Sequence, residues 1–300
     1  MKALNFGSLN LDHVYSVPHQ VRTGETLPAA GYETHVGGKG LNQSVALRGG
    51  GVPVFHAGCV GKDGGMLVDF LASRGVDTSL IRVSDTPTGH AVIQVDAAGD
   101  NGILLYPGAN YAIDETQAEE TLRGFDAGDL LVLQNETSCL ETMIRKARDK
   151  RMLIALNPSP VDQALLSLPL EMVDILIFNE VEGKQLAGCD APGDILDALV
   201  QKYPRARLVL TLGSAGSVYR QGQIVLRQQA YRVAAVDTTG AGDTFTGFFL
   251  SALMRGEQAG DALRLASAAA AMSVTRKGAA ESIPQLPDVL DWLTARHKDA

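Results

Sequence analysis

The stretch Leu130-Leu131-Val132-Leu133 is apolar at every position, and three further short runs of this kind follow it in the chain. They are Leu153-Ile154-Ala155-Leu156, Ile175-Leu176-Ile177-Phe178 and Leu208-Val209-Leu210. Uninterrupted apolar runs of this length are typical of parallel strands that are buried on both faces of a sheet. The segments between them, residues 140–150, 180–187 and 195–203, have helical patterns. This alternation predicts an α/β fold with a doubly wound, mainly parallel sheet flanked by helices.

Polar residues follow these runs at the points where the expected strands end. They are Asn135 and Glu136, Asn157, Asn179 and Glu180, and Thr211 with Gly213. In open α/β sheets, ligands bind at the carboxyl ends of the parallel strands. We therefore expect the functional site to lie along this edge of the sheet.

Two segments, residues 12–35 and 87–106, are strand-like and poor in helical patterns. Within the second, residues 88–95 and 102–106 flank a turn that contains Gly99, which predicts a β-hairpin. Together the segments predict a small β-sheet that forms a lid over a cleft, where it would exclude water from a reacting group. A β-extension without a role in catalysis, or a dimer contact, is the alternative. We accordingly divide the chain into an α/β core, residues 1–11, 36–86 and 107–300, and a β-lid, residues 12–35 and 87–106.

Composition excludes several classes of protein. The formal net charge of −8 argues against a nucleic-acid partner, because such proteins normally carry a basic face. No apolar run approaches the roughly 20 residues needed to cross a bilayer, and the first residues show no signal-peptide pattern, so we expect a cytoplasmic protein. The three cysteines, Cys59, Cys139 and Cys189, are odd in number and lack CxxC spacing, which favours free thiols in a reducing compartment.

The strongest local motif is Asp237-Thr238-Thr239-Gly240-Ala241-Gly242-Asp243, which precedes the apolar helical segment 248–253. Glycines at the mouth of a helix allow the amides of residues 240–242 to point into one concavity, where the helix dipole favours an anion. Asp243 would then lie beside a bound phosphate and could accept a proton from an attacking hydroxyl. Alternatively, it is an ordinary acidic residue in the first turn of a helix.

A second glycine-rich motif, Gly37-Gly38-Lys39-Gly40-Leu41-Asn42-Gln43-Ser44, opens a predicted helix. It is neither a Walker A loop nor a GxGxxG motif. We expect its glycines to bring the backbone close to a ligand, and Lys39 and Asn42 to donate hydrogen bonds to hydroxyls. Further candidates for binding a polyol are Asn10, Asp12 and Glu136. Each of these alone could instead cap a helix or a turn.

Taken together, six motifs resemble the ribokinase family in their order along the chain. They are residues 7–12, 37–43, 179–182, 211–216, 237–245 and 274–279. The match covers essentially the whole chain. The GAGD element marks the wider family, which includes fructokinases, adenosine kinases and minor phosphofructokinases, whereas GGKGxNQ is similar to the ribokinase branch.

This resemblance implies phosphorylation of D-ribose at its 5-hydroxyl by MgATP, with Asp243 as the general base and a monovalent-cation site. The matching sugar-binding positions are Asn10, Asp12, Gly38, Lys39, Asn42, Glu136 and Asp243. The matching nucleotide-binding positions are Asn179, Thr211, Gly213, Ser214, Gly216 and Gly242. Glu182 matches the acidic residue that is associated indirectly with magnesium. The potassium-site positions are Asp237, Thr239, Ser273, Arg276, Gly278 and Ser282.

The geometry of the loop at residues 237–242 also favours a cation site. A loop that turns its amides toward a phosphate turns its carbonyls outward, where with Asp237 they would form an oxygen-rich pocket. Asp237 could instead cap the turn through its own backbone.

Three residues depart from the family pattern. Leu41 replaces the more usual alanine and His90 a small aliphatic residue, and both could reshape the sugar pocket, although His90 could also be a residue of the lid surface. Ser267 stands where asparagine or histidine is expected near the nucleotide. A same-family kinase acting on deoxyribose, a ketohexose or adenosine therefore stays open, as does a non-catalytic sugar sensor. The exposed edge of the lid sheet leads us to expect a homodimer.

Overall fold

The computed structural model describes residues 1–298 and contains one large sheet. Its nine strands run in the order β13-β12-β11-β10-β9-β8-β1-β4-β5. Their bounds are β1 Ala3–Phe6, β4 Val54–Gly61, β5 Asp77–Ser84, β8 Leu130–Gln134, β9 Leu153–Asn157, β10 Ile175–Asn179, β11 Arg207–Thr211, β12 Ser217–Gln221 and β13 Ile224–Gln228. All neighbours from β5 to β11 are parallel, and β12 and β13 add an antiparallel edge. The four predicted runs lie in β8 to β11, and the predicted fold class is confirmed.

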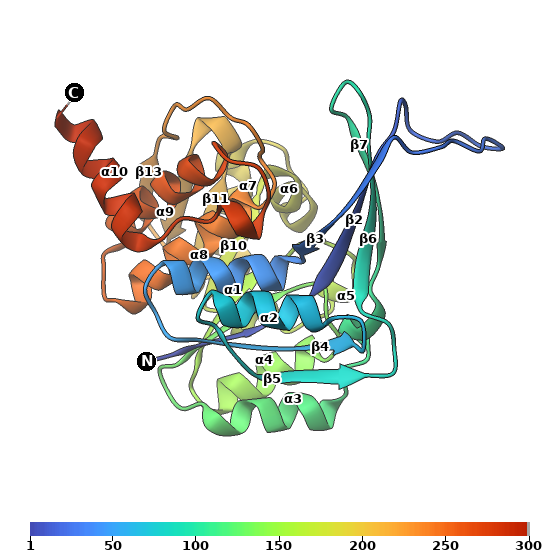
Figure 1. Ribbon diagram of the computed structural model, residues 1–300. Coiled ribbons are helices and arrows are strands. Elements are labelled where there is room, and N and C mark those ends of the chain that lie inside the picture. Colours follow the sequence, from blue (N-terminus) through green and yellow to red (C-terminus); the bar gives the residue numbers. More distant parts are fainter. Residues whose placement is uncertain (299–300) are drawn as a thin grey trace.

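Helices cover both faces of this sheet (Figure 1). They are α1 Lys39–Gly49, α2 Gly65–Ser73, α3 Glu115–Thr121, α4 Leu140–Asp149, α5 Gln163–Leu166, α6 Glu180–Ala187, α7 Pro192–Lys202, α8 Ala241–Met254, α9 Ala259–Ser273 and α10 Leu286–Lys298. Short 3₁₀ helices span η1 Gly108–Tyr111, η2 Leu122–Gly124, η3 Leu170–Met172, η4 Gly213–Ala215 and η5 Ala280–Ser282. Within the described chain, no helix has the length and apolar character that a membrane span requires.

Strand β8 shows why the predicted runs are apolar at every position. Its residues Leu130 and Val132 face a core formed with α1, α2, α8, α9 and α10. Leu131 and Leu133, which alternate with them, face a second core formed with α3 to α7. Because both faces of the strand are buried, no position along it is left for a polar side chain.

A second, four-stranded sheet stands beside the core (Figure 1). Its strands are β3 Gly31–Gly37, β2 Asn10–Ser16, β6 Gly89–Val95 and β7 Asn101–Tyr106, in that spatial order. The predicted hairpin forms β6 and β7, and its turn is closed by a hydrogen bond from the amide of Asp96 to the carbonyl of Asp100. Residues 17–30, between β2 and β3, contain no helix or strand and extend beyond the sheet. The sheet begins at Asn10 and β3 ends at Gly37, two residues outside each end of the expected segment 12–35. The last two residues of the expected core segment, 299–300, lie outside the described residues.

The glycines at the start of α1 are required by contacts within the chain. A Cβ atom at Gly40 would lie 2.3 Å from the backbone nitrogen of Ser8, and one at Gly37 would lie 2.1 Å from Oδ2 of Asp12. Gly38 has φ 96°, a left-handed conformation that favours glycine. Gly40 therefore lets α1 pack on the end of β1, and Gly37 leaves room for the side chain of Asp12. Our expectation that these glycines bring the backbone close to a ligand stays a prediction.

Candidate functional site

Two cavities meet at the carboxyl ends of the parallel strands. The first, which we call the lid cavity, has a volume of about 420 Å³ and lies between the core and the lid residues Ala91, Ile93, Ile103 and Leu105. The second, which we call the apolar cavity, has a volume of about 630 Å³. Its apolar lining comes from Ala230, Tyr231, Val233, Ala235, Phe245, Ala270, Ala271 and Val274. Thr211, Thr238, Ala241 and Gly242 line both cavities, so the two meet at the first turn of α8.

All the residues that the sequence predicts to bind sugar line the lid cavity. They are Asn10, Asp12, Gly38, Lys39, Asn42, Glu136 and Asp243. Five of those predicted to bind nucleotide, Thr211, Gly213, Ser214, Gly216 and Gly242, line the apolar cavity, as does Ser267. Irregular residues 230–235 also contribute to this cavity, and no sequence pattern indicates it.

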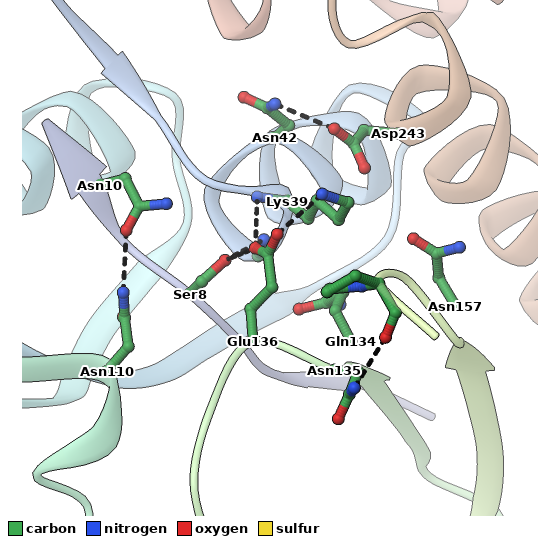
Figure 2. Close-up of polar contacts among 12 residues, drawn as sticks. Ser8, Asn10, Lys39, Asn42, Asn110, Gln134, Asn135, Glu136, Asn157 and Asp243 are labelled. Carbon is green, nitrogen blue, oxygen red and sulfur yellow. Dashed lines mark hydrogen bonds and ion pairs between the residues drawn. The ribbon is translucent and has the colours of Figure 1, made fainter. Parts of the chain in front are cut away.

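Asp243 lies in the first turn of α8, where both of its carboxylate oxygens accept hydrogen bonds from α1. Oδ2 accepts from Nδ2 of Asn42 and Oδ1 from Nε2 of Gln43, each at 2.9 Å (Figure 2 shows the contact with Asn42). Burial raises the pKa of Asp243 to about 6, although the charge of Lys39 and the two amide donors oppose this rise. The side chain is therefore a carboxylate at pH 7 that gains a proton more readily than an exposed aspartate does.

The start of α8 is open to both cavities. Gly240, with φ 72°, is the N-cap residue of the helix, and no side chain caps the first amides of α8. The first amides of an α-helix have no partner within the helix, although Ala241 donates to the carbonyl of Thr238 at 3.3 Å. A Cβ atom at Gly242 would meet no protein atom within 4 Å. This turn can therefore receive an anion, with the amides beyond Ala241 most open to it.

Glu136 and Lys39 form an ion pair on the floor of the lid cavity. Nζ of Lys39 lies 2.7 Å from Oε1 of Glu136, and the hydroxyl of Ser8 donates to Oε2 at 2.5 Å (Figure 2). Burial lowers the pKa of Lys39, but Glu136 and Asp243 outweigh it and raise the pKa above its usual value. Ser8 lies within the motif 7–12, but its contact with Glu136 spans 128 residues of sequence and becomes visible only in the fold.

Asp12 and Asn10 reach the lid cavity from β2. Burial, followed by the charge of Glu136, raises the pKa of Asp12 to about 6, and His35, its partner across the sheet, opposes the rise. Oδ1 of Asn10 accepts from Nδ2 of Asn110 at 2.8 Å (Figure 2). Asn110, in η1, also pairs with the backbone N–H and carbonyl of Leu9, so it fixes the start of the lid.

Asn179 lines only the lid cavity, whereas Thr211, its partner on β11, and Gly242 line both cavities. Oδ1 of Asn179 accepts from the amide of Glu182 at 2.9 Å, and Oε2 of Glu182 accepts from the amide of Asn179 at 3.0 Å. The two side chains form a capping box that begins α6. Since Oε1 of Glu182 also accepts from Nδ2 of Asn179, both carboxylate oxygens are engaged, which suits an indirect role near a cation better than direct ligation.

Asp237 joins the loop before α8 to the segment after α9. Its Oδ1 accepts from the amide of Thr239 at 2.9 Å and its Oδ2 from the amide of Gly278 at 3.0 Å. The carbonyl of Val274 in turn accepts from the amides of Val236 and Asp237. The structure thus brings together the two segments that are predicted to hold potassium. Asp237 also caps its own turn, which is the alternative role considered for it from the sequence.

The hydroxyls of Ser273 and Ser282 donate to backbone carbonyls, which leaves their oxygens able to accept or to ligate a cation. Arg276 lies three residues after Ser273, the last residue of α9, and its backbone amide donates to the carbonyl of Ser273. The donor set of these segments is oxygen-rich and suits an alkali cation. No cluster of three or more His, Cys, Asp or Glu that could hold a metal occurs in residues 1–298.

Two of the departures from the family pattern lie away from the sugar candidates. Leu41 belongs to α1 and is fully buried in the core that this helix covers. The ring of His90 packs against His13 and Tyr106, with centroids 5.7 and 5.1 Å away, on the lid face opposite Ala91 and Ile93. Neither residue is among the described residues that line the lid cavity. His90 is therefore a residue of the lid surface, the second of the two roles considered for it from the sequence.

Comparisons with known proteins agree with this architecture. The model of the pfkB family of carbohydrate kinases matches residues 2–286. A ribokinase of Haemophilus influenzae is 37% identical over 297 residues, which cover 96% of this chain and 96% of that protein. A deoxyribokinase of Salmonella typhi is 31% identical over 301 residues, or 96% of this chain and 97% of that one. The solved structure of Arabidopsis thaliana ribokinase complexed with ribose and ATP has a TM-score of 0.88 and 31% identity, and covers 97% of this chain and 98% of its own.

The family match spans nearly the whole sequence, and the two cavities meet at an open helix N-terminus that carries the half-buried carboxylate of Asp243. The chain therefore belongs to the pfkB family of carbohydrate kinases, phosphotransferases that act on an alcohol group.

Proposed function

We propose that the protein transfers the γ-phosphoryl group of ATP to the 5-hydroxyl of D-ribose, giving ribose 5-phosphate, with Asp243 as the general base. The observation that carries the proposal is the position of Asp243, which lies in the open first turn of α8 and lines the lid cavity. The ribokinase relatives from Haemophilus influenzae and Arabidopsis thaliana support D-ribose as the substrate.

In this proposal the sugar occupies the lid cavity. Asp12, a carboxylate, accepts hydrogen bonds from sugar hydroxyls, whereas Lys39 and the amide groups of Asn10 and Asn42 can donate to them. Glu136 holds the ammonium group of Lys39 in place. Closure of the lid brings its apolar residues over the sugar and excludes water.

ATP occupies the apolar cavity, where Thr211, Gly213, Ser214 and Gly216 contact it and the adenine lies among apolar side chains. Its phosphates reach the shared turn of α8, and the amides at residues 240–242 stabilise negative charge on the transferred phosphoryl group. Asp243 takes the proton of the attacking hydroxyl, so the nucleophile becomes more reactive as it approaches. Positioning of both substrates supplies much of the remaining rate enhancement.

Two cations complete the proposal. Magnesium, when bound with ATP, would neutralise charge on the phosphates, and Glu182 would act on it indirectly because its carboxylate caps α6. Potassium is held by Asp237, Thr239, Ser273, Arg276, Gly278 and Ser282, through side-chain and backbone oxygens. The Asp237 bridge between the two segments supports this site, because a cation there would fix the loop that precedes α8.

We also propose that the small sheet is a mobile lid and the site of dimerisation. Residues 12–35 and 87–106 form the lid and the rest of the chain the core that binds nucleotide and sugar. The lid face that points away from the cavity carries exposed Tyr32, Leu104 and Tyr106, which favours contact with a second copy. Cytoplasmic localisation stays a prediction.

A sugar panel tests the proposed function. We expect ADP release with D-ribose to show the highest kcat/KM among pentoses, hexoses and nucleosides, because the lid cavity is polar at its floor and the lid residues that line it, Ala91, Ile93, Ile103 and Leu105, offer no aromatic ring to a nucleobase. A preference for deoxyribose, fructose or adenosine would overturn the ribose assignment but not the kinase assignment. Sugar binding without ADP release from any substrate would indicate a sugar sensor.

Potassium is expected to raise kcat/KM several-fold over tetramethylammonium at equal ionic strength. Asp237→Ala should abolish this response, because the loop loses its link to Gly278. Asp114→Ala provides a matched control, since that carboxylate likewise accepts a backbone amide but at the start of α3. Equal rates in the two cations would reject the site.

A further inference from the structure

Gln43 has a contact with the candidate base that the sequence motif does not explain. It follows Asn42 on α1 and is fully buried. Asn42 lines the lid cavity, whereas Gln43 is absent from the described lining of both cavities. Gln43 therefore cannot contact the sugar there, and it reaches the site of chemistry through its 2.9 Å hydrogen bond to Oδ1 of Asp243.

The orientation of the Gln43 amide is fixed first from the side of β1. Nδ2 of Asn5 donates to the backbone carbonyl of Gly40 at 2.7 Å, and a carbonyl can only accept. Oδ1 of Asn5 must therefore face Nε2 of Gln134, which donates to it at 3.0 Å. The same nitrogen donates to Oε1 of Gln43 at 2.8 Å, so the NH₂ group of Gln43 has to point the other way, toward Asp243.

The orientation is fixed again from the side of β9 and β10. Nδ2 of Asn157 donates to the backbone carbonyl of Ile177 at 2.9 Å, so Oδ1 of Asn157 faces Gln43 and accepts from its Nε2 at 3.2 Å. Two backbone carbonyls on separate elements thus impose the same direction on one amide. A reversed Gln43 would place its carbonyl oxygen against the carboxylate of Asp243 and the amide oxygen of Asn157, where both contacts are repulsive (Figure 2 shows Gln134, Asn157 and Asp243).

We infer that Gln43 is a positioning residue that holds Asp243 in its proton-accepting orientation and as a carboxylate, and that Gln134 and Asn157 impose the direction of its amide. This inference rests on the proposed role of Asp243 as the base.

The charges around Asp243 show why such a donor matters. Glu136, beyond β8, disfavours the carboxylate, as burial does, and Lys39 of α1 favours it. The amides of Asn42 and Gln43 add to the influence of Lys39, and they lower the pKa of Asp243 against the effect of burial. Because Asn42 also lines the sugar cavity, Gln43 is the donor whose removal leaves the substrate contacts intact.

Gln43→Met, which keeps the length of the side chain and removes the donor, tests the inference. We expect the acidic limb of the pH profile of kcat to move up by about one unit, since a hydrogen bond to a charged group is of this size. At pH 7 kcat should fall about 10-fold, because Asp243 loses its fixed orientation as well as part of its ionised population. KM for sugar and for ATP should change by less than about threefold, because neither substrate loses a contact. An unchanged kcat and pH profile in the folded variant would overturn the inference.

Gln43→Glu is the second variant, and it preserves the shape of the buried side chain if the methionine variant does not fold. Two adjacent carboxylates cannot both ionise easily, so the acidic limb should again move to higher pH. Gln117→Met is the matched control, because Gln117 is also a buried glutamine and donates to the carbonyl of Gly58 far from Asp243. It should lower thermal stability and leave the pH profile unchanged.

Direct titration of Asp243 separates this inference from the proposed function. The ¹³C NMR signal of the Asp243 carboxyl carbon is assigned in labelled protein as the signal that is missing in Asp243→Asn. Its chemical shift as a function of pH reports the pKa of Asp243 without turnover. An upward shift in Gln43→Met or Gln43→Glu supports the positioning role even if the wild-type protein phosphorylates no sugar, in which case only the proposed function fails. An unchanged titration in a folded variant of either kind, with active wild-type protein, would refute the role of Gln43 alone.

Discussion

Replacement of Asp243 by asparagine is expected to lower kcat by about 10²- to 10⁴-fold, the usual contribution of a positioned general base. Asparagine retains the size of the side chain but cannot take a proton from the sugar hydroxyl. Since Asn10, Asp12 and Lys39 remain in place, KM for sugar and the affinity for ATP should change little. Steady-state kinetics with D-ribose and MgATP measure the effect.

A matched control is Asp129→Asn. Asp129 is also a buried aspartate and accepts backbone amides from Lys2 and Asp126, but it precedes β8, at the edge of the sheet opposite the cavities. This variant should keep kcat within about twofold of wild type, because surface and structural changes away from the site alter stability rather than chemistry. Near wild-type turnover in Asp243→Asn would contradict its assignment as the base.

Asp12→Ala should act mainly on sugar binding and lower kcat/KM for D-ribose by about 10- to 100-fold. The loss follows from hydrogen bonds to a charged group, each of which contributes roughly 1.5 to 3 kcal/mol. Burial and Glu136 raise the pKa of Asp12 to about 6, so its carboxylate is present above pH 6 and lost as the pH falls through that value. The comparison should therefore be made at pH 8.

The control for this variant is Asp100→Ala, because Asp100 lies in the exposed turn between β6 and β7 of the same lid. It should leave kcat/KM unchanged. If both variants lost activity equally, the effect would come from the lid fold and not from contact between Asp12 and sugar.

The sequence predicts the centre of the large sheet well and its edges poorly. Strands β8 to β11 are apolar on both faces, so their pattern is unambiguous. β5 and β13 lie at the edges and are partly exposed, which removes the continuous apolar run. The antiparallel β12–β13 hairpin likewise follows from pairing geometry that no local pattern shows.

Residues of the candidate site that lie within a distinctive sequence motif could be predicted. The side chains that hydrogen-bond to them in the fold could not. Glycine-rich motifs mark Asp243, Lys39 and Asn42. Gln43 lies within such a motif, but its contacts with Asp243 and Asn157 span 200 and 114 residues of sequence. Such partners are brought together only by the fold, and single amide residues carry no periodic signal.

Asn179 belongs to a sequence motif that is compatible with two different roles. The spacing Asn179-x-x-Glu182 is that of a capping box, and the structure contains one. A local hydrogen-bonding motif at the end of a strand can therefore resemble a ligand contact, because both need a polar side chain at the same place. The position of Asn179 in the lid cavity follows from the pairing of β10 with β9 and β11.

The most direct test of the account is the identity of the phosphorylated product. The protein, incubated with D-ribose, MgATP and potassium, should form ribose 5-phosphate and ADP in equal amounts, as followed by ³¹P NMR, and Asp243→Asn should form both far more slowly. ADP without a sugar phosphate, or phosphate on a hydroxyl other than the 5-hydroxyl, would contradict the proposed placement of sugar and ATP on either side of the first turn of α8.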